Sequence, residues 1–141
     1  MVISARVRNS KGVHAAVVTS GGEAKHVSIP PKPEGFGSSV SGAELLFLSL
    51  ATCYCNDLYR EAKKRDIEIR EIEVEVSGSF GGEGDIAHNV RFRPRIKSSA
   101  PWSQVQELLR FTDTVAEVQK TLRQGIPVEL TLETEQPAVT S

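Results

Sequence analysis

The sequence lacks the features that would direct it to a membrane or to nucleic acid. Its 141 residues include 17 basic and 18 acidic side chains, and no basic patch with interleaved aromatic residues occurs. Nucleic acid is therefore not an expected partner. No apolar run reaches the roughly 18 residues of a membrane span, and the first residues lack the apolar core of a signal peptide. We expect no membrane partner and a cytoplasmic location.

The motifs of common cofactor and metal sites are also missing. The sequence contains no nucleophile-elbow serine and no dinucleotide fingerprint. Its histidines are dispersed over predicted strands, with no spacing typical of a metal site, at His14, His26 and His88. A glycine cluster at 81–84 precedes no helical pattern, so a hairpin turn is a better interpretation than a phosphate cradle. We expect neither a cofactor nor a metal ion.

Cysteine is scarce, and the two that occur lie close together. Cys53 and Cys55 fall within one predicted helix. Residues two apart on a helix point about 200° away from each other. A disulfide between them would need local unwinding, so we predict two reduced thiols.

The helix around these cysteines is strongly apolar. Ser41 and Glu44 stand in the spacing of a capping box, which predicts where the helix starts. From Leu45 to Cys53 the side chains leave no polar face, so we predict that this half is buried on every side. The helix then continues with a polar face to Arg65. A cysteine inside such a helix is the best candidate for chemistry in the chain.

The residues before this helix predict a small sheet and a long loop. Strand patterns cover 2–9, 13–19 and 24–29, with turn residues between them. A loop with three prolines follows at 30–41. A loop of this length is typical of a lid or the wall of a site. A plain connector into the helix is an equally open interpretation.

A central hairpin is predicted from strands at 69–80 and 86–97. Acidic and apolar residues alternate on the first strand, and basic and apolar residues on the second. A turn centred near Glu83 would place the charges opposite one another on the outer face and the apolar side chains on the inner face. We therefore interpret the arginines as a charge ladder rather than an anion site. The predicted pairs are Glu75 with Arg91, Glu73 with Arg93 and Glu71 with Arg95.

Two helices and a strand are predicted after the hairpin. Ser103 starts the first helix and Thr114 starts the second, each followed three residues later by a side chain in capping-box spacing. Gly125 ends the second helix. A final strand is predicted at 126–133.

Together these elements predict an α+β fold in one domain over residues 1–133. Antiparallel sheets, formed by the N-terminal three-stranded meander and the central hairpin, are expected around the long buried helix. Residues 134–141 are predicted to form a flexible tail.

Five short motifs stand in a specific order along the chain. They are Pro33-x-Gly35-x-Gly37, Glu44-Leu45-Leu46, Ala51-Thr52-Cys53, Val118-Gln119-Lys120-Thr121-Leu122 and Gly125-Ile126-Pro127-Val128. In order and spacing, residues 5–133 resemble the OsmC/Ohr family of stress-response proteins. The resemblance implies an intertwined homodimer with the long helices buried centrally and the sites at the dimer interface. An all-round apolar helix agrees with this, because it needs cover on every side.

The resemblance also implies a chemistry for Cys53. In catalytic members a helical cysteine attacks a hydroperoxide, a second cysteine closes a disulfide, and an arginine and a glutamate assist. Cys53 matches the first cysteine, whereas the second falls on Ala116 and the assisting glutamate on Ala43. Glu44 lies nine residues before Cys53, on the opposite side of a straight helix, and is interpreted as a cap.

With no arginine in the third strand or the following loop, Lys25 and His26 are the nearby candidates to stabilise a thiolate.

Two functions follow from this incomplete match. The first is a single-cysteine thiol peroxidase of weak or altered activity, which reduces organic hydroperoxides and is restored by an external thiol or dithiol. The second is a non-catalytic member that binds a small apolar ligand at the dimer interface, with Cys53 as a buried hydrophobe. The candidates to line its pocket are Phe36, Leu46, Leu50 and Tyr54. Retention of Cys53 favours the enzyme, and the losses at Ala116 and Ala43 favour the binding protein.

Overall fold

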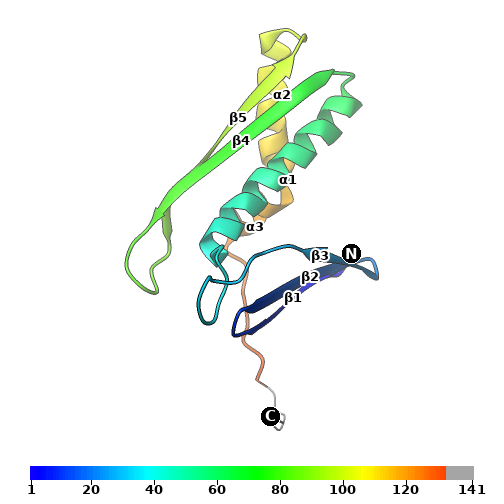
Figure 1. Cartoon of the computed structure of the whole chain (residues 1–141). Coiled ribbons are helices and arrows are strands. Elements are labelled where there is room, and N and C mark those ends of the chain that lie inside the picture. Colours follow the sequence, from blue (N-terminus) through cyan, green and yellow to red (C-terminus); the bar gives the residue numbers. More distant parts are fainter. Residues whose placement is uncertain (133–141) are drawn as a thin grey trace. The chain divides into compact units, whose positions relative to one another are not determined.

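The chain folds into three strands, a long helix, a β-hairpin and two further helices, in that order (Figure 1). This computed structural model describes residues 1–132. The predicted α+β class with antiparallel sheets is confirmed. The elements are β1 (Ile3–Ser10), β2 (Val13–Ser20), β3 (Glu23–Val27), α1 (Gly42–Lys64), β4 (Ile69–Phe80), β5 (Ala87–Ser98), α2 (Trp102–Val115) and α3 (Glu117–Gln124).

Contacts divide the chain into two compact units. The first comprises Met1–Thr52 with Glu75–Arg93, and the second comprises Cys53–Val74 with the chain from Pro94 onward. We describe each unit by itself. The prediction of one domain over 1–133 remains a prediction, and both its last residue and the predicted tail lie outside the described residues.

Strands β1, β2 and β3 form the predicted antiparallel meander in the first unit. The pairing of β1 with β2 runs from Ile3 opposite Ser20 to Ser10 opposite Val13. β3 lies on the other edge of β2. Gly12 sits at the first turn with φ of 72°, which a residue with a side chain rarely adopts.

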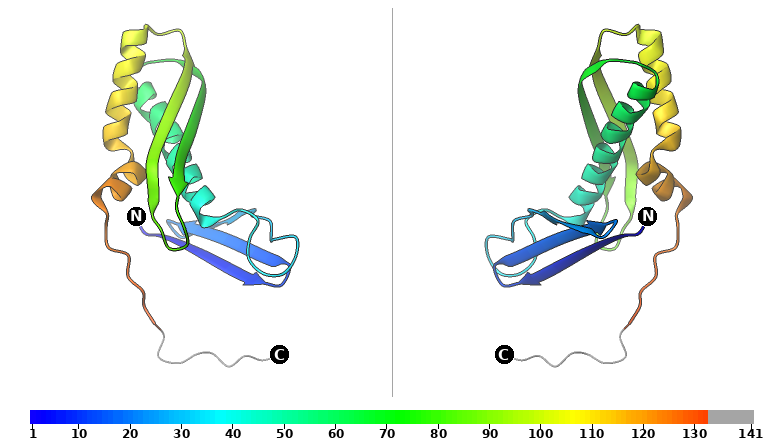
Figure 2. Two further views of the ribbon diagram at one scale, coloured as in Figure 1. Left: turned by 90° about the vertical axis from the view of Figure 1, so that its left-hand side faces the viewer. Right: turned by 90° about the vertical axis from the view of Figure 1, so that its right-hand side faces the viewer.

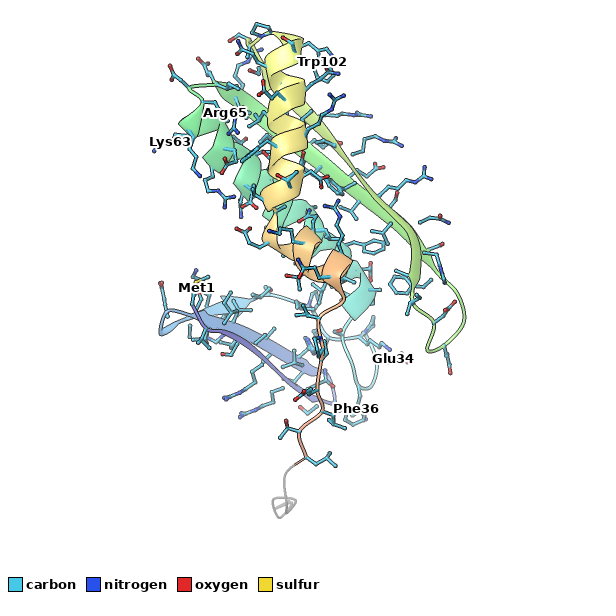
Figure 3. All side chains as sticks on the ribbon, turned by 180° about the vertical axis from the view of Figure 1, so that it is seen from behind. Met1, Glu34, Phe36, Lys63, Arg65 and Trp102 are labelled. Atoms are coloured by element: carbon cyan, nitrogen blue, oxygen red, sulfur yellow. The ribbon has the colours of Figure 1, made fainter. Side chains whose placement is uncertain are left out.

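Hydrogen bonds tie the loop before α1 to the end of this meander. The side chain of Asn9 accepts from the Gly37 amide at 2.9 Å and donates to the Gly37 carbonyl at 3.1 Å. The Gly12 amide donates to the Gly35 carbonyl at 2.9 Å. Phe36 lies on the same loop with its side chain exposed (Figure 3). These bonds fix the path of the loop from within its own unit.

The capping box at the start of α1 is confirmed. The Ser41 amide donates to Glu44 Oε1 at 2.9 Å, and the Glu44 amide donates to Ser41 Oγ at 3.1 Å. Hydrogen bonds from the backbone and the side chain of Ser41 favour the ionised carboxylate and hold the pKa of Glu44 below its usual value.

The sequence predicts that the first half of α1 is buried on every side, but within one chain it is only partly buried. Phe47 packs against Phe80, with the ring centroids 5.8 Å apart, and Leu50 is buried. Leu46 and Leu48 are 36% and 59% exposed. A single hairpin covers one side of a helix, so the opposite side stays open unless a second chain covers it.

β4 and β5 form a two-stranded hairpin (Figure 2). Its residues confirm the predicted alternation of exposed charged and half-buried apolar side chains, but not the predicted pairs of glutamate with arginine. The glutamates and arginines of the predicted ladder are exposed, and Ile72, Val74 and Phe92 are half-buried. Glu71 pairs with Lys97 at 2.7 Å instead of Arg95. Among residues 69–98 no ion pair joins Glu73 or Glu75 to an arginine, and the placement of each glutamate opposite its arginine stays a prediction. Alternation determines the outward face, whereas the pairing depends on how the turn is spanned.

The second half of α1 packs against α2 in the second unit. Tyr54, Leu58 and Leu108 are fully buried, and the Tyr54 hydroxyl donates to the Leu109 carbonyl at 2.6 Å. Burial raises the pKa of Tyr54.

The starts predicted for the last two helices need correction. α2 begins at Trp102 after Pro101, without a side-chain cap from Ser103. Thr114 lies inside α2, where its hydroxyl donates to the Phe111 carbonyl at 2.6 Å. The extended Ala116 separates the helices, and Gly125, with φ of 58°, ends α3 as predicted.

The predicted final strand is wrong for the part that the structure describes. Residues 126–132 adopt no regular structure. Val128, Leu130 and Leu132 are 93%, 85% and 77% exposed. The alternating pattern is that of a strand, but a strand needs a neighbour for its hydrogen bonds. Glu133 lies outside the described residues.

Among residues 1–132, no helix combines the length and the apolar character needed to cross a membrane.

Candidate functional site

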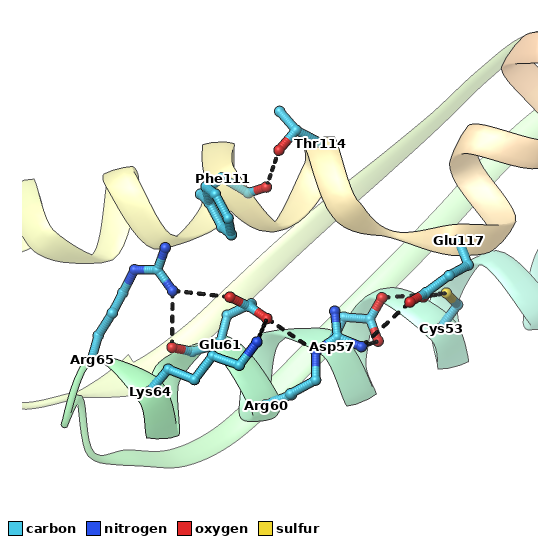
Figure 4. A network of polar contacts seen from close by, with 9 residues as sticks. All are labelled: Cys53, Asp57, Arg60, Glu61, Lys64, Arg65, Phe111, Thr114 and Glu117. Carbon is cyan, nitrogen blue, oxygen red and sulfur yellow. Dashed lines mark hydrogen bonds and ion pairs between the residues drawn. The ribbon is translucent and has the colours of Figure 1, made fainter.

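The sulfur of Cys53 faces two carboxylates in the second unit (Figure 4). Asp57, one turn further along α1, places Oδ2 at 3.7 Å from Sγ. Glu117, the first residue of α3, places Oε2 at 3.8 Å. Cys53 is half-buried and Asp57 is buried, whereas the Glu117 side chain is 67% exposed. The thiol can therefore donate its proton to either carboxylate, and of the two Glu117 is the one exposed to solvent.

Arg60 joins the two carboxylates on their far oxygens. Its Nη1 donates to Asp57 Oδ1 at 2.9 Å and to Glu117 Oε1 at 3.5 Å. Each carboxylate thus turns one oxygen toward the sulfur and the other toward the guanidinium. The sequence produces this locally, because residues four and seven positions after Cys53 share its face of α1.

A buried carboxylate holds Arg60 in place. Glu61, with a side chain only 5% exposed, accepts from Arg60 Nε at 3.0 Å. It also accepts from Lys64 at 3.0 Å and from Arg65 at 3.2 Å. The bonds to Arg60 and Lys64 lower the pKa of Glu61 to about 2. Arg65 also stacks on the Phe111 ring at 4.4 Å, which ties the end of α1 to α2.

Cys53 carries a thiol of low acidity. Burial raises the pKa of Cys53 above its ordinary value, and the charges of Asp57 and Glu117 raise it further. The backbone N–H of Val118, in the first turn of α3, hydrogen-bonds the sulfur and opposes them. The resting group is therefore a neutral thiol with one donor placed to stabilise a thiolate.

The two carboxylates differ in acidity. Burial raises the pKa of Asp57, and so does its hydrogen bond to Glu117. The same hydrogen bond, together with Arg60 and the backbone amide of Glu117, holds the pKa of Glu117 below its usual value. A proton shared by the pair is therefore held by Asp57, which makes Asp57 the better proton acceptor beside the thiol.

Metal binding is a chemical possibility at this cluster. Cys53, Asp57 and Glu117 offer one sulfur and two oxygens that all lie within 4.8 Å of one another. A divalent cation would require the thiolate form. Arg60 already supplies one positive charge to both carboxylates, which offsets part of the negative charge that would attract a cation.

The other predicted site residues are placed elsewhere. Lys25 and His26 lie on the exposed strand β3 of the first unit, and their support for Cys53 stays a prediction. Tyr54 is a core residue whose hydroxyl donates to the Leu109 carbonyl. The pocket predicted from Phe36, Leu46, Leu50 and Tyr54 also stays a prediction.

Sequence reasoning missed the groups that surround the sulfur. Asp57 and Arg60 carry a readable signal, because they follow Cys53 at the spacing of one helix face. The signal at Glu117 is weaker: it follows Ala116, the position that matches the second cysteine of the catalytic members. The activating groups predicted from the sequence precede Cys53, whereas the groups that surround its sulfur all follow it.

A hollow of about 420 Å³ adjoins the exposed side of the cluster. Glu117 lines it together with Val115, Lys120, Thr121, Gln124 and Ile126. Glu117 is thus shared between the hollow and the thiol. Cys55 is half-buried and takes part in none of the bonds of the cluster.

Several solved structures share the fold of this chain. An OsmC-like protein from Mycoplasma pneumoniae is 20% identical, with a TM-score of 0.58 and 86% of each chain covered. An OsmC-like protein of unknown function from Vibrio cholerae is 16% identical, with a TM-score of 0.60 over 86% of this chain and 93% of that one. An OsmC-like hydroperoxide resistance protein from Jannaschia is 15% identical, with a TM-score of 0.58 and 96% of each chain covered. The comparison with curated proteins found no match.

The sequence itself carries the family signal. The profile of the OsmC-like proteins matches residues 35–131, which include α1, the hairpin, α2 and α3. This range contains Cys53 and every residue of its cluster. The chain therefore belongs to the family of OsmC-like proteins.

Proposed function

We propose that this protein is a thiol-dependent reductase of organic hydroperoxides, slow at neutral pH, with Cys53 as the reacting group. The proposal rests on one observation: the sulfur of the half-buried Cys53 lies 3.7 Å from Asp57 Oδ2, a carboxylate that can accept its proton, and a hydrogen bond from the Val118 backbone favours the thiolate. One solved relative is named for hydroperoxide resistance, which agrees with this chemistry. The reaction needs a reducing compartment, and we place it in the cytoplasm.

The first step oxidises the sulfur by two electrons. Asp57 takes the thiol proton, and the thiolate attacks the terminal oxygen of the hydroperoxide. The S–O bond forms, the O–O bond breaks, and the alkoxide leaves as an alcohol after it receives the proton from Asp57. Arg60 stabilises the Asp57 carboxylate before it takes the proton and after it has given the proton up.

An external thiol completes the cycle. It attacks the sulfur of the sulfenic acid, releases water and forms a mixed disulfide with Cys53. A second thiol releases the external disulfide and restores Cys53. The side chain at 116 is a methyl group, so no second cysteine at that position can do this within the chain.

Mass spectrometry after hydroperoxide treatment tests the proposal. We expect Cys53 to gain one oxygen and a small thiol to reverse the change. A Cys53→Ser variant should lose hydroperoxide consumption, and the matched Cys55→Ser variant should retain it. Excess peroxide should carry Cys53 to irreversible oxidised forms and stop turnover. An unmodified Cys53 after treatment with an organic hydroperoxide would falsify the enzyme proposal.

The second candidate is binding of a small apolar ligand without catalysis. The raised pKa of Cys53 favours it, because a neutral thiol is a poor nucleophile. Under this proposal Cys53→Ser and wild type bind the ligand equally, and neither consumes hydroperoxide. A thermal-shift screen with apolar compounds on both proteins distinguishes the two candidates.

A further inference from the structure

We propose that Glu117 is a specificity-determining residue that repels anionic reagents, so that Cys53 reacts with uncharged or cationic hydroperoxides and thiols. This inference rests on the proposed function for its natural substrates, but not for the selection by charge. A carboxylate-bearing hydroperoxide or thiol is accordingly a poor substrate. An uncharged hydroperoxide and an uncharged or amino-bearing thiol are good ones.

The order of the charges around the sulfur supports the proposal. Glu117 Oε2 and Asp57 Oδ2 face Sγ at 3.8 and 3.7 Å, whereas Arg60 contacts only the far oxygens of both groups. The sulfur therefore meets negative charge first. The direction of the Cys53 pKa agrees, because both carboxylates raise it.

Exposure makes Glu117, rather than Asp57, the group that an incoming reagent meets. The Glu117 side chain is 67% exposed and that of Asp57 is 9% exposed. Glu117 also lines the hollow of about 420 Å³ beside the cluster. Lys120 is the other charged side chain of this hollow, and it forms no ion pair with Glu117 or Asp57. Removing Lys120 should therefore strengthen the selection, and removing Glu117 should weaken it.

A pair of alkylating reagents of similar size measures the selection without any peroxide. Iodoacetamide is neutral and iodoacetate is anionic, and both alkylate the same thiolate with loss of iodide. Their rates are compared in a Cys55→Ser background, where Cys53 is the single thiol. The ratio of the two rates cancels the thiolate fraction, so a change in the pKa of Cys53 alone does not move it.

The measured quantity is the ratio of the iodoacetamide rate to the iodoacetate rate. We expect this ratio to be about fivefold higher for Cys53 than for a small uncharged thiol, because one charge near 4 Å in water changes a rate by about that factor. Glu117→Gln should remove most of the excess, and Lys120→Gln should increase it. Glu107→Gln removes an exposed glutamate on α2 outside the cluster and should leave the ratio unchanged. The excess should also shrink as salt is added.

Two results would overturn the inference: no excess preference in the Cys55→Ser protein itself, or an excess that Glu117→Gln leaves intact. The first measurement needs no change at Glu117, so it stands even where that variant folds poorly. If the alkylation rates show the expected preference but the protein consumes no hydroperoxide, the proposed reductase is refuted and charge selection at Cys53 stands. Hydroperoxide consumption without this preference would do the reverse.

Discussion

At the scale of single residues, Asp57 has two opposite effects on Cys53. As a charge it raises the pKa of the thiol, and as a base it accepts the thiol proton. Replacement by asparagine removes both the charge and the base. The two effects can still be separated, because they act on two different reactions of Cys53. Alkylation needs only a thiolate, whereas hydroperoxide reduction also needs a proton delivered to the leaving group.

Asp57→Asn should therefore move the two rates in opposite directions. The pKa of Cys53 falls, so its alkylation by iodoacetamide at pH 7 should rise about two- to fivefold. Hydroperoxide reduction should fall at least about tenfold, because the proton carrier is lost. The check is a pH series of both rates in the Cys55→Ser background. A parallel rise of both rates would show that Asp57 acts only as a repelling charge.

Glu61 makes the free energy of unfolding depend on pH in the acid range. Hydrogen bonds from Arg60, Lys64 and Arg65 lower its pKa in the folded chain to about 2, well below the ordinary value of a glutamate. A lowered carboxyl pKa contributes stability above the unfolded pKa, and this contribution is lost as pH falls through the folded one.

Glu61→Gln should lower the thermal unfolding midpoint at pH 7 by several degrees. The difference from wild type should narrow between pH 5 and pH 2, because wild type alone loses a contribution there. Midpoints measured across this range, with Glu107→Gln as the control, test the expectation. A difference that stays constant down to pH 2 contradicts it.

At the scale of elements, the start of each helix could be predicted only where side chains define it. Ser41 and Glu44 form the expected capping box, so α1 begins where the pattern indicates. Ser103 stands in the same pattern and would cap a helix from Gln104, yet α2 starts two residues earlier, at Trp102, and uses no side-chain cap. Pro101 has a fixed φ and lacks an N–H, which suits the position before a helix without any side-chain bond.

These two serines provide a matched pair of substitutions. Ser41→Ala removes a hydrogen bond to the Glu44 amide and should lower the free energy of unfolding by about 1 kcal/mol. Ser103→Ala removes no such bond and should change it by less than about 0.5 kcal/mol. Urea unfolding followed by circular dichroism measures both values. Equal losses in the two variants would show that the caps were assigned incorrectly.

The element patterns also show what a sequence leaves open. Alternation correctly predicted that Ile72 and Val74 turn inward on β4. It did not determine the partner of Glu71, because exposed ion pairs are worth little and do not fix the register. The cluster at Cys53 joins residues 64 positions apart, and no local pattern predicts that α3 brings Glu117 to α1.

At the scale of the whole molecule, apolar surface is left uncovered in a way that calls for a second chain. Leu46 and Leu48 are exposed on α1, and Val128, Leu130 and Leu132 are exposed in the segment after α3. Monomeric proteins rarely leave large apolar patches open. The segment alternates like a strand but has no neighbour within the described residues 1–132. We propose that a second copy covers α1 and pairs with this segment, which would explain why the predicted strand is absent from one chain.

The protein should therefore be a dimer with an extensive interface at micromolar concentration. Leu48→Asp places a charge on the exposed apolar face of α1 and should shift the mass measured by light scattering toward the monomer, with a lower unfolding midpoint. Lys11→Gln changes the net charge by the same amount in an exposed turn and should leave the dimer intact. A monomeric mass for the unmodified protein would contradict the proposal. A dimer that tolerates Leu48→Asp would instead exclude the Leu48 side of α1 from the interface.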